Sequence, residues 1–375
     1  MSSVKITGIR TAHVQLPLSK PLGVGAWWNE LREFVLVWID TDAGHVGTGL
    51  TFGGYFRGQG RVTDLVIKEY LTPQLVGEDP RDTERLWNKM YRRCLMQSRK
   101  GVMVWGISAL DIALWDIKAK LAGMPLWQLL GGAHHSLPAY ATGGYYRPDE
   151  GLDELAAEVE RYKSRGIDSM KLKLGHLAPH EDAERMRICR EVLGPRGRIA
   201  VDANNAWPTA HDALRAVRML EKYDLWFIEE PLAPDDLNGA AHLAKVLDTP
   251  IVNGEVAVTR MDLRDLVEKQ AADILQFDAL MVGGITQALK GVHLAECHDM
   301  QFIPAWIADL HLNLALCSNS GFVIEWHVPE EKTLQLTELI AEPAEFRDGR
   351  IFGHRRPGHG IEFRSELVER YRARE

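Results

Sequence analysis

Between residues 137 and 325 the chain repeats one pattern, a short apolar segment followed in most cases by an amphipathic helical segment. Short runs of Val, Ile and Leu joined by helices predict parallel strands with crossover helices. Eight such strands favour a closed (β/α) barrel over an open sheet. The candidate strands span residues 137–142, 169–174, 199–202, 225–229, 251–254, 274–277, 302–304 and 322–325.

The residues before this repeat predict a small α+β domain. Extended, β-rich segments are expected at 5–18, 33–39 and 45–52, and helices at 61–76, 81–97 and 101–122. Two segments that mix glycines with aromatic residues, 23–28 and 52–60, are interpreted as mobile flaps or as ordinary surface loops. The expected domains are residues 1–125 (α+β), 126–335 (barrel) and 336–375, a C-terminal segment that returns to the first domain.

Composition excludes several classes of protein. The 375 residues carry a net charge of −8 without a long basic block, which argues against nucleic acid or an anionic membrane as a partner. Four cysteines, Cys94, Cys189, Cys297 and Cys317, form no CxxC and fit unpaired core thiols in a reducing compartment. No signal-peptide pattern opens the chain, and the most apolar helical stretch, 101–122, is too charged to span a bilayer. We expect a soluble, cytoplasmic protein.

Charged residues lie at or just beyond the carboxyl ends of the predicted strands, the face on which barrels carry their active sites. Successive positions are separated by between 29 residues (173 to 202) and 20 residues (305 to 325), about one repeat each. These side chains are therefore expected to meet at one mouth of the barrel. In strand order they are Lys171 and Lys173, Asp202, Glu229, Glu255, Asp278 and Glu325, with Ala305 at the seventh position.

Three of these acids, Asp202, Glu229 and Glu255, come from consecutive strands. Carboxylates gathered in one mouth repel one another unless a cation lies between them. An all-oxygen ligand set favours Mg²⁺, with Mn²⁺ as the second choice. The alternative is that each acid caps the following helix or pairs with an arginine.

Lys171 and Lys173 are two residues apart on a predicted strand and so face the same side. Two neighbouring ammonium groups lower each other's pKa, and a neutral lysine is a competent general base. A KxK pair alone is also common on exposed strand faces. Opposite a metal site it indicates catalysis.

These motifs together resemble the mandelate racemase subgroup of the enolase superfamily. The resemblance rests on the lysine pair, DxN at 202–204, EEP at 229–231, GE at 254–255, Asp278, and the segment ISALDIALWDIKAKLAGMPLWQLLGG at 107–132. It implies an α/β fold, a (β/α)₇β modified TIM barrel behind an N-terminal α+β capping domain. It also implies removal of the proton α to a carboxylate by a base, with Mg²⁺ stabilising the enediolate.

The resemblance implies roles for individual residues. Asp202, Glu229 and Glu255 correspond to the metal ligands and Lys173 to the base. Lys171 would lower the pKa of Lys173 and neutralise the substrate carboxylate. Asn204 resembles a residue that contacts substrate, and Glu325 an acid that hydrogen-bonds the substrate carboxylate.

One departure from the family pattern bears on the reaction. The family places a second base, a histidine paired with the aspartate of strand six, where this chain has Ala305. Asp278 remains and is expected to lack that partner, since His298 and His311 are interpreted as structural. A two-base racemase is therefore disfavoured.

One base and a metal suffice to eliminate water from a polyhydroxy acid. Tyr145 and Tyr146, after the first barrel strand, are candidates for the acid (Tyr146) and for substrate contacts, or else pack at the rim. Flap residues that suit a polyhydroxy substrate are Trp27, Trp28, Tyr55 and Arg57.

The sequence thus predicts a Mg²⁺-dependent dehydratase that converts an acid sugar to a 2-keto-3-deoxy acid. Two alternatives stay open: a racemase, epimerase or lactone cycloisomerase, and a non-catalytic ligand-binding member, suggested by Ala305. The expected partner is a small carboxylate, and the family resemblance implies a homo-oligomer, commonly an octamer.

Overall fold

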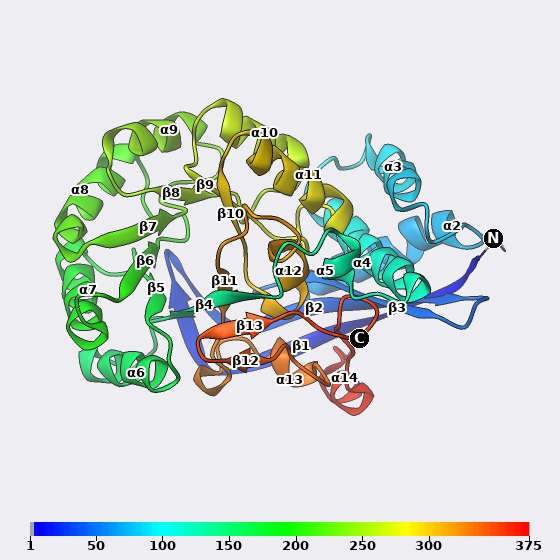
Figure 1. Cartoon of the computed structure of the whole chain (residues 1–375), viewed down its shortest axis with the longest axis horizontal. Coiled ribbons are helices and arrows are strands. Elements are labelled where there is room, and N and C mark those ends of the chain that lie inside the picture. The colour runs from blue at the N-terminus through cyan, green and yellow to red at the C-terminus, as the bar shows by residue number, and fades with distance from the viewer. Residues whose placement is uncertain (1–3, 375) are drawn as a thin grey trace.

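The computed structural model describes residues 4–374. It contains a closed β/α barrel and, before it in the chain, an antiparallel sheet with helices (Figure 1). The expected α/β fold with an N-terminal α+β capping domain is confirmed.

The capping sheet has the order β1 (Ile6–Val24), β2 (Trp27–Thr41) and β3 (Val46–Gly54), with both pairs antiparallel. The strands are longer than expected because the glycine-rich segment 23–28 is the tip of the β1–β2 hairpin and not a separate loop. Gly23 pairs there with Trp28, and Val24 with Trp27. Gly23 also exchanges two backbone hydrogen bonds with Tyr146, at 2.7 and 3.2 Å, so the tip is attached to the barrel.

Helices cover one face of this sheet. The longest, α4, packs directly on β3 because glycines lie beneath it: a Cβ atom at Gly47 or Gly49 would meet the backbone oxygen of Ala113 or Ala109 at 2.3 and 2.0 Å. Apolar residues of both α4 and β2 therefore form one core. The helices of this part are α1 (Gln59–Leu65), the π-helical η1 (Val66–Leu71), α2 (Thr72–Leu75), α3 (Thr83–Cys94), α4 (Val102–Ala122) and α5 (Leu126–Leu129).

The barrel contains eight parallel strands and seven connecting helices. Most of these helices form an arc outside the strands in Figure 1. From β4 to β10 each strand pairs with the next, and β11 pairs with β4. Phe302 N of β10 donates to Ser320 O just before β11, at 3.0 Å, which closes the ring. In chain order the elements are β4 (Ser136–Gly143), α6 (Leu152–Ser164), β5 (Ser169–Lys173), α7 (Pro179–Leu193), β6 (Arg198–Asp202), α8 (Ala210–Leu220) with η2 (Glu221–Tyr223), β7 (Leu225–Glu229), α9 (Leu237–Val246), β8 (Ile251–Asn253), α10 (Arg260–Glu268), β9 (Ile274–Phe277), α11 (Gly284–Cys297), β10 (Gln301–Pro304), α12 (Ala308–Ala315) and β11 (Ile324–Trp326).

The barrel interior is filled, as in other barrels of this class. One buried cluster draws a residue from most strands: Tyr140, Ala200, Phe227, Val252, Ile274, Ile303 and Val323. Because apolar side chains fill the interior, the charged side chains of the site lie at the carboxyl ends of the strands.

The C-terminal segment contacts both parts of the chain. β13 pairs antiparallel with β4, and Ala373 N donates to His13 O of β1 at 2.9 Å. Its elements are η3 (Pro329–Glu331), α13 (Leu336–Leu339), β12 (Phe346–Arg347), β13 (Arg350–Phe352) and α14 (Ser365–Tyr371).

The capping sheet also packs on the mouth of the barrel. Phe34 of β2 and Phe52 of β3 contact Trp306, with ring centroids 5.3 and 5.0 Å apart. The sheet therefore covers the ends of the barrel strands that carry the charged residues. None of the helices in residues 4–374 is long and apolar enough to cross a membrane.

Candidate active site

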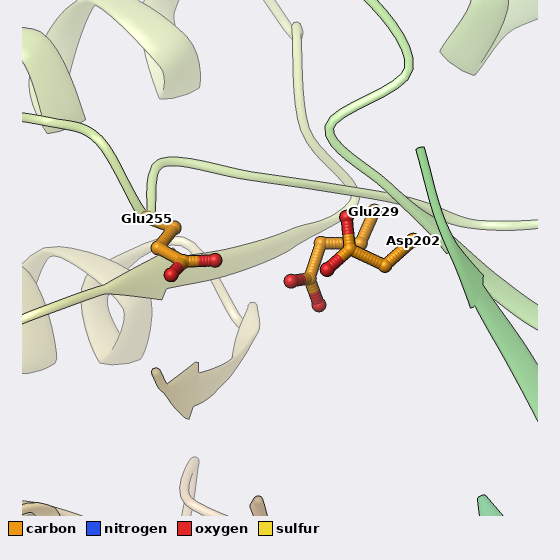
Figure 2. Close-up of side chains that lie close together, drawn as sticks. All are labelled: Asp202, Glu229 and Glu255. Atoms are coloured by element: carbon orange, nitrogen blue, oxygen red, sulfur yellow. The ribbon is translucent and has the colours of Figure 1, made fainter. Parts of the chain in front are cut away.

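Three acids from neighbouring strands converge at the mouth of the barrel. Asp202 ends β6, Glu229 ends β7, and Glu255 follows β8 by two residues. One carboxylate oxygen of each lies within 4.8 Å of the others, and Figure 2 shows Glu255 directed toward the other two. Because hard divalent cations take carboxylate oxygens as ligands, this group could hold one.

The protonation of these acids also fits a bound cation. Burial raises the pKa of Glu229 well above its usual value, and neighbouring Asp202 adds to the rise while Lys171 opposes it. Burial together with Glu230 raises the pKa of Glu255 to about 8. Burial is the largest cause in both cases, and a bound cation would favour the ionised form of both acids.

Lys171 links the acids of three strands. Its Nζ lies 2.6 Å from Glu229 Oε1, 3.1 Å from Glu325 Oε1 and 3.6 Å from Asp202 Oδ2. Burial alone would lower the pKa of Lys171, but Glu229 and Glu325 raise it well above its usual value. Lys171 is therefore a fixed positive charge at the floor of the site.

Lys173 contacts Asp202 through its Nζ and faces the cavity above. Burial would lower its pKa, and so does Lys171, as the sequence predicts, but Asp202, Tyr145 and Glu255 together raise the pKa above its usual value. A cation bound to Asp202 would compete with the ammonium for that carboxylate. The metal-binding acid and the predicted base are thus directly coupled.

Glu325 is held in place by two donors from adjacent segments. Thr142 Oγ1 donates to Oε1 at 2.6 Å, and Trp306 N donates to Oε2 at 2.8 Å. Burial would raise the pKa of Glu325, but Lys171 and then His327 lower it. Glu325 is therefore an anion beside the floor of the cavity.

A small cavity lies between the capping sheet and these charged groups. Strand β2 contributes Trp27, Asn29 and Arg32, and the loop after β3 contributes Tyr55. The barrel side contributes Tyr145, Lys173, Asn204, Glu255, Trp306, Glu325 and His327. A second, more apolar cavity adjoins it and shares Trp27, Tyr55 and Trp306.

Several polar atoms around this cavity are buried without a hydrogen-bond partner. They are Trp27 Nε1, both side-chain polar atoms of Asn29, Asn204 Oδ1 and His327 Nε2. Buried polar groups without partners are rare in folded proteins. A ligand rich in hydroxyl groups would satisfy them.

Three predicted site residues lie away from the cavity. Tyr146 OH donates to Asp182 Oδ1 at 2.5 Å, and burial raises its pKa. Trp28 packs edge-on against His176, and both line a separate pocket over α6 and α7. Arg57 is exposed and donates to Gln15 Oε1 at 3.0 Å. The structure brings Trp27, Tyr55, Tyr145 and Asn204 to the cavity and leaves these three outside it.

Asp278 has a histidine neighbour, although not from the position that the family pattern uses. His311 Nε2, on α12, lies 3.1 Å from Asp278 Oδ1. Ala305 occupies the position after β10 and is fully buried. Neither Asp278 nor His311 lines the cavity, so His311 does not replace the second base of the family pattern.

Sequence reasoning missed Arg32 and His327. Arg32 shares a face of β2 with Phe34 and Leu36, which are buried, and a cation two residues before a buried apolar run is a signal that the sequence offers. His327 follows Glu325 by two residues, the same spacing as that between Lys171 and Lys173, which places both side chains on one side of a strand. In both cases period-two alternation would have placed the side chain toward the site.

Known proteins match this chain over nearly its whole length. Residues 6–131 match the mandelate racemase/muconate lactonizing enzyme N-terminal domain, and residues 154–367 match the enolase C-terminal domain-like family. Arabinonate dehydratase of Saccharolobus solfataricus is 37% identical over 349 residues, 91% of each chain. L-talarate/galactarate dehydratase of Salmonella typhimurium is 35% identical over 90% of this chain and 82% of its own.

Solved structures agree with this relationship. The crystal structure of a racemase from Streptomyces coelicolor with bound magnesium has a TM-score of 0.92 and 30% identity, and the match covers 98% of this chain and 100% of that one. Curated relatives include both dehydratases and cycloisomerases. The chain belongs to the mandelate racemase/muconate lactonizing enzyme family of the enolase superfamily.

Proposed function

We propose that this protein is a Mg²⁺-dependent dehydratase of an acid sugar, which it converts to a 2-keto-3-deoxy acid. The observation that supports this most is that Lys173 and the three acids Asp202, Glu229 and Glu255 meet at one buried site. A purely ligand-binding protein needs no such arrangement. The relatives named dehydratases act on substrates of this class.

Asp202, Glu229 and Glu255 would hold the metal ion. When bound, Mg²⁺ would neutralise the negative charge that grows on the substrate carboxylate as the α-proton leaves. Mn²⁺ has the same ligand preference and is the second choice.

The chain's own groups would bind the substrate and move its protons. Lys171 faces the substrate carboxylate as a fixed cation, and Asn204 Oδ1 accepts a hydrogen bond from a hydroxyl group of the substrate. Lys173, as the neutral amine, removes the α-proton. The resulting ammonium returns this proton to the departing β-hydroxyl, so that water leaves and the enol tautomerises to the 2-keto acid.

Tyr145 lies where it can assist this step. Lys173 Nζ is 5.3 Å from the centre of its ring, and both residues line the cavity. Burial raises the pKa of Tyr145, so its hydroxyl stays protonated and can donate a hydrogen bond to the leaving group.

The test is turnover of a panel of aldonates and aldarates in the presence of Mg²⁺. We expect 2-keto-3-deoxy acid from at least one member, and none from Lys173→Ala, with Lys163→Ala on the exposed surface of α6 as the matched control. Exchange of the α-proton with solvent deuterium reports proton removal independently of elimination. Absence of both keto acid and exchange across the panel would overturn the proposal.

A racemase, epimerase or cycloisomerase is the second candidate, because a histidine also lines the cavity. His327 Nε2 has no hydrogen-bond partner and shares the cavity with Lys173. Burial lowers the pKa of His327 to about 3, so it is a neutral imidazole at neutral pH. Deuterium exchange with inversion, or lactone opening, without keto acid would favour this candidate.

A further inference from the structure

Arg32 is a buried cation without an acid partner. The residue is 2% exposed, and its Nε donates to the backbone oxygen of Thr333 at 3.0 Å. Within residues 4–374, its terminal nitrogens make no hydrogen bond and it forms no ion pair. Buried charges in proteins are normally paired, because an unpaired charge loses its hydration without compensation.

Two aromatic rings lie within cation–π distance of this guanidinium. Its central carbon lies 5.4 Å from the centre of the Tyr55 ring and 5.3 Å from the centre of the Trp306 ring. Because Nε is bonded to Thr333, the donors that stay free are the terminal nitrogens. Arg32 lines the cavity that also contains Lys173 and Glu255.

The neighbours of Arg32 on the capping sheet are also without partners. Asn29, three residues before it on β2, is 1% exposed, and neither its amide nitrogen nor its oxygen has a hydrogen bond. Trp27 Nε1 is a further buried donor without an acceptor. The capping side of the cavity therefore presents a cation and two neutral donors, and it contributes no acid to the cavity lining.

The opposite side of the cavity already provides for one carboxylate. Lys171 and the metal-binding acids lie on the barrel side of the cavity, where the reacting carboxylate is placed by the proposed function. Arg32 comes from the capping domain, on the other side of the same cavity. A bidentate guanidinium fits a carboxylate better than it fits a hydroxyl group.

We infer that the substrate is a dicarboxylic acid sugar, an aldarate, whose second carboxylate binds Arg32, with Asn29 and Trp27 as neighbouring donors. This inference rests on the proposed function for the position of the first carboxylate. If it is correct, residues of the capping strand β2 determine whether the protein prefers an aldarate or an aldonate. The relatives divide over the same choice, since one is named for arabinonate and another for talarate and galactarate.

The kinetic test compares acids of matched configuration, such as glucarate with gluconate and galactarate with galactonate. We expect kcat/KM to favour the aldarate of the productive pair by about 100-fold or more, the usual effect of a buried charge pair. Arg32→Met should reduce this preference to about 10-fold or less, and Arg32→Lys should give an intermediate ratio because the ammonium is not bidentate. Arg10→Met, an exposed arginine on β1 that pairs with Asp40, is the control and should leave the ratio unchanged.

A binding test separates this inference from the proposed function. Thermal stabilisation by each acid is measured with Mg²⁺ in the Lys173→Ala background, where no turnover is needed. Aldarates should stabilise Lys173→Ala more than aldonates do, and the difference should disappear in Lys173→Ala/Arg32→Met. Selective aldarate binding without turnover by the wild type would refute the dehydratase and leave the inference standing.

Three results would overturn the inference. They are equal kcat/KM for aldarate and aldonate, an equal loss on both acids in Arg32→Met, and no stabilisation by any aldarate at millimolar concentration. Preference for 6-phosphogluconate over glucarate would assign Arg32 to a phosphate instead of a carboxylate. If Arg32→Met does not fold, the ratio in Arg32→Lys decides.

Discussion

Asp278 and His311 face each other without forming a charge relay. His311 Nε2 lies 3.1 Å from Asp278 Oδ1, but the same nitrogen accepts a hydrogen bond from Ala279 N at 2.9 Å. A nitrogen that accepts this bond carries no proton to donate to the carboxylate. Asp278 Oδ1 instead accepts from Leu280 N at 2.7 Å, which makes the pair part of the β9–α11 turn.

The first prediction follows for Asp278→Asn. Because no histidine connects Asp278 to the cavity, kcat should fall less than about 10-fold, while Lys173→Ala should lose about 1,000-fold or more, as expected for loss of a general base. Rates of product formation and of α-deuterium exchange measure the loss of activity in both variants. A loss in Asp278→Asn as large as that in Lys173→Ala would show that Asp278 takes part in proton transfer.

The second prediction concerns the metal site. A cation that binds only the folded protein stabilises it by about 2.7 kcal/mol at 100 times its dissociation constant. Mg²⁺ should therefore raise the Tm of the wild type and should have a much smaller effect on Glu255→Gln. Glu268→Gln, an exposed acid on α10, is the control, and Mn²⁺ in a parallel titration tests the second choice of metal. Equal Mg²⁺ stabilisation of Glu255→Gln and the wild type would contradict the assignment.

The barrel was predictable because its signal is local and repeated. Each strand is a short apolar run, and each charged residue follows such a run, so the sequence alone assigns Asp202, Glu229 and Glu255 to one mouth. The eight parallel strands agree with this prediction. The cytoplasmic location and the homo-oligomeric state stay predictions.

The part of the site that the capping domain contributes was not predictable by the same reasoning. Loop composition suggested flaps, but Gly23 and Trp28 are paired strand residues, because pairing between distant segments outweighs local glycine content. Which aromatic residue turns inward also depends on tertiary contacts: Trp27 lines the cavity, whereas Trp28 packs on His176. Arg32 reaches the site only because β2 lies across the barrel mouth.

The third prediction concerns the loop that carries Tyr55. Glu33 anchors this loop by accepting hydrogen bonds from Gly58 N at 2.7 Å and Gly60 N at 2.6 Å, and His13 lies 3.0 Å from it. Glu33→Gln replaces one acceptor oxygen by a donor, which should cost about 1–3 kcal/mol locally. We expect a higher KM and faster tryptic cleavage at the exposed Arg57.

Two comparisons make this test specific. Asp40→Asn, at the far end of the same strand and bonded to Arg10, should leave the rate of cleavage at Arg57 unchanged. Saturating substrate should slow cleavage of Glu33→Gln, because the ligand holds Tyr55 in the cavity. Cleavage rates equal to the wild type would mean that Glu33 does not restrain the loop.

The fourth prediction is a pH dependence of stability located at His354. Burial, and then the charge of Arg356, lower the pKa of His354 to about 4 from its ordinary value of 6.5, and its Nε2 has no hydrogen-bond partner. The unfolded chain therefore binds a proton below pH 6.5 that the folded protein takes up only near pH 4. Linkage requires that this residue's contribution to stability, present above pH 6.5, is lost as the pH falls through this window.

His354→Gln removes this titration. The wild type should lose up to about 3 kcal/mol more unfolding free energy than His354→Gln between about pH 7 and pH 4, with most of the difference arising between pH 6.5 and pH 4. Urea unfolding at several pH values measures this difference, and His293→Gln, an exposed histidine on α11, should follow the wild type. If the wild type and His354→Gln have the same pH slope, burial does not hold His354 neutral.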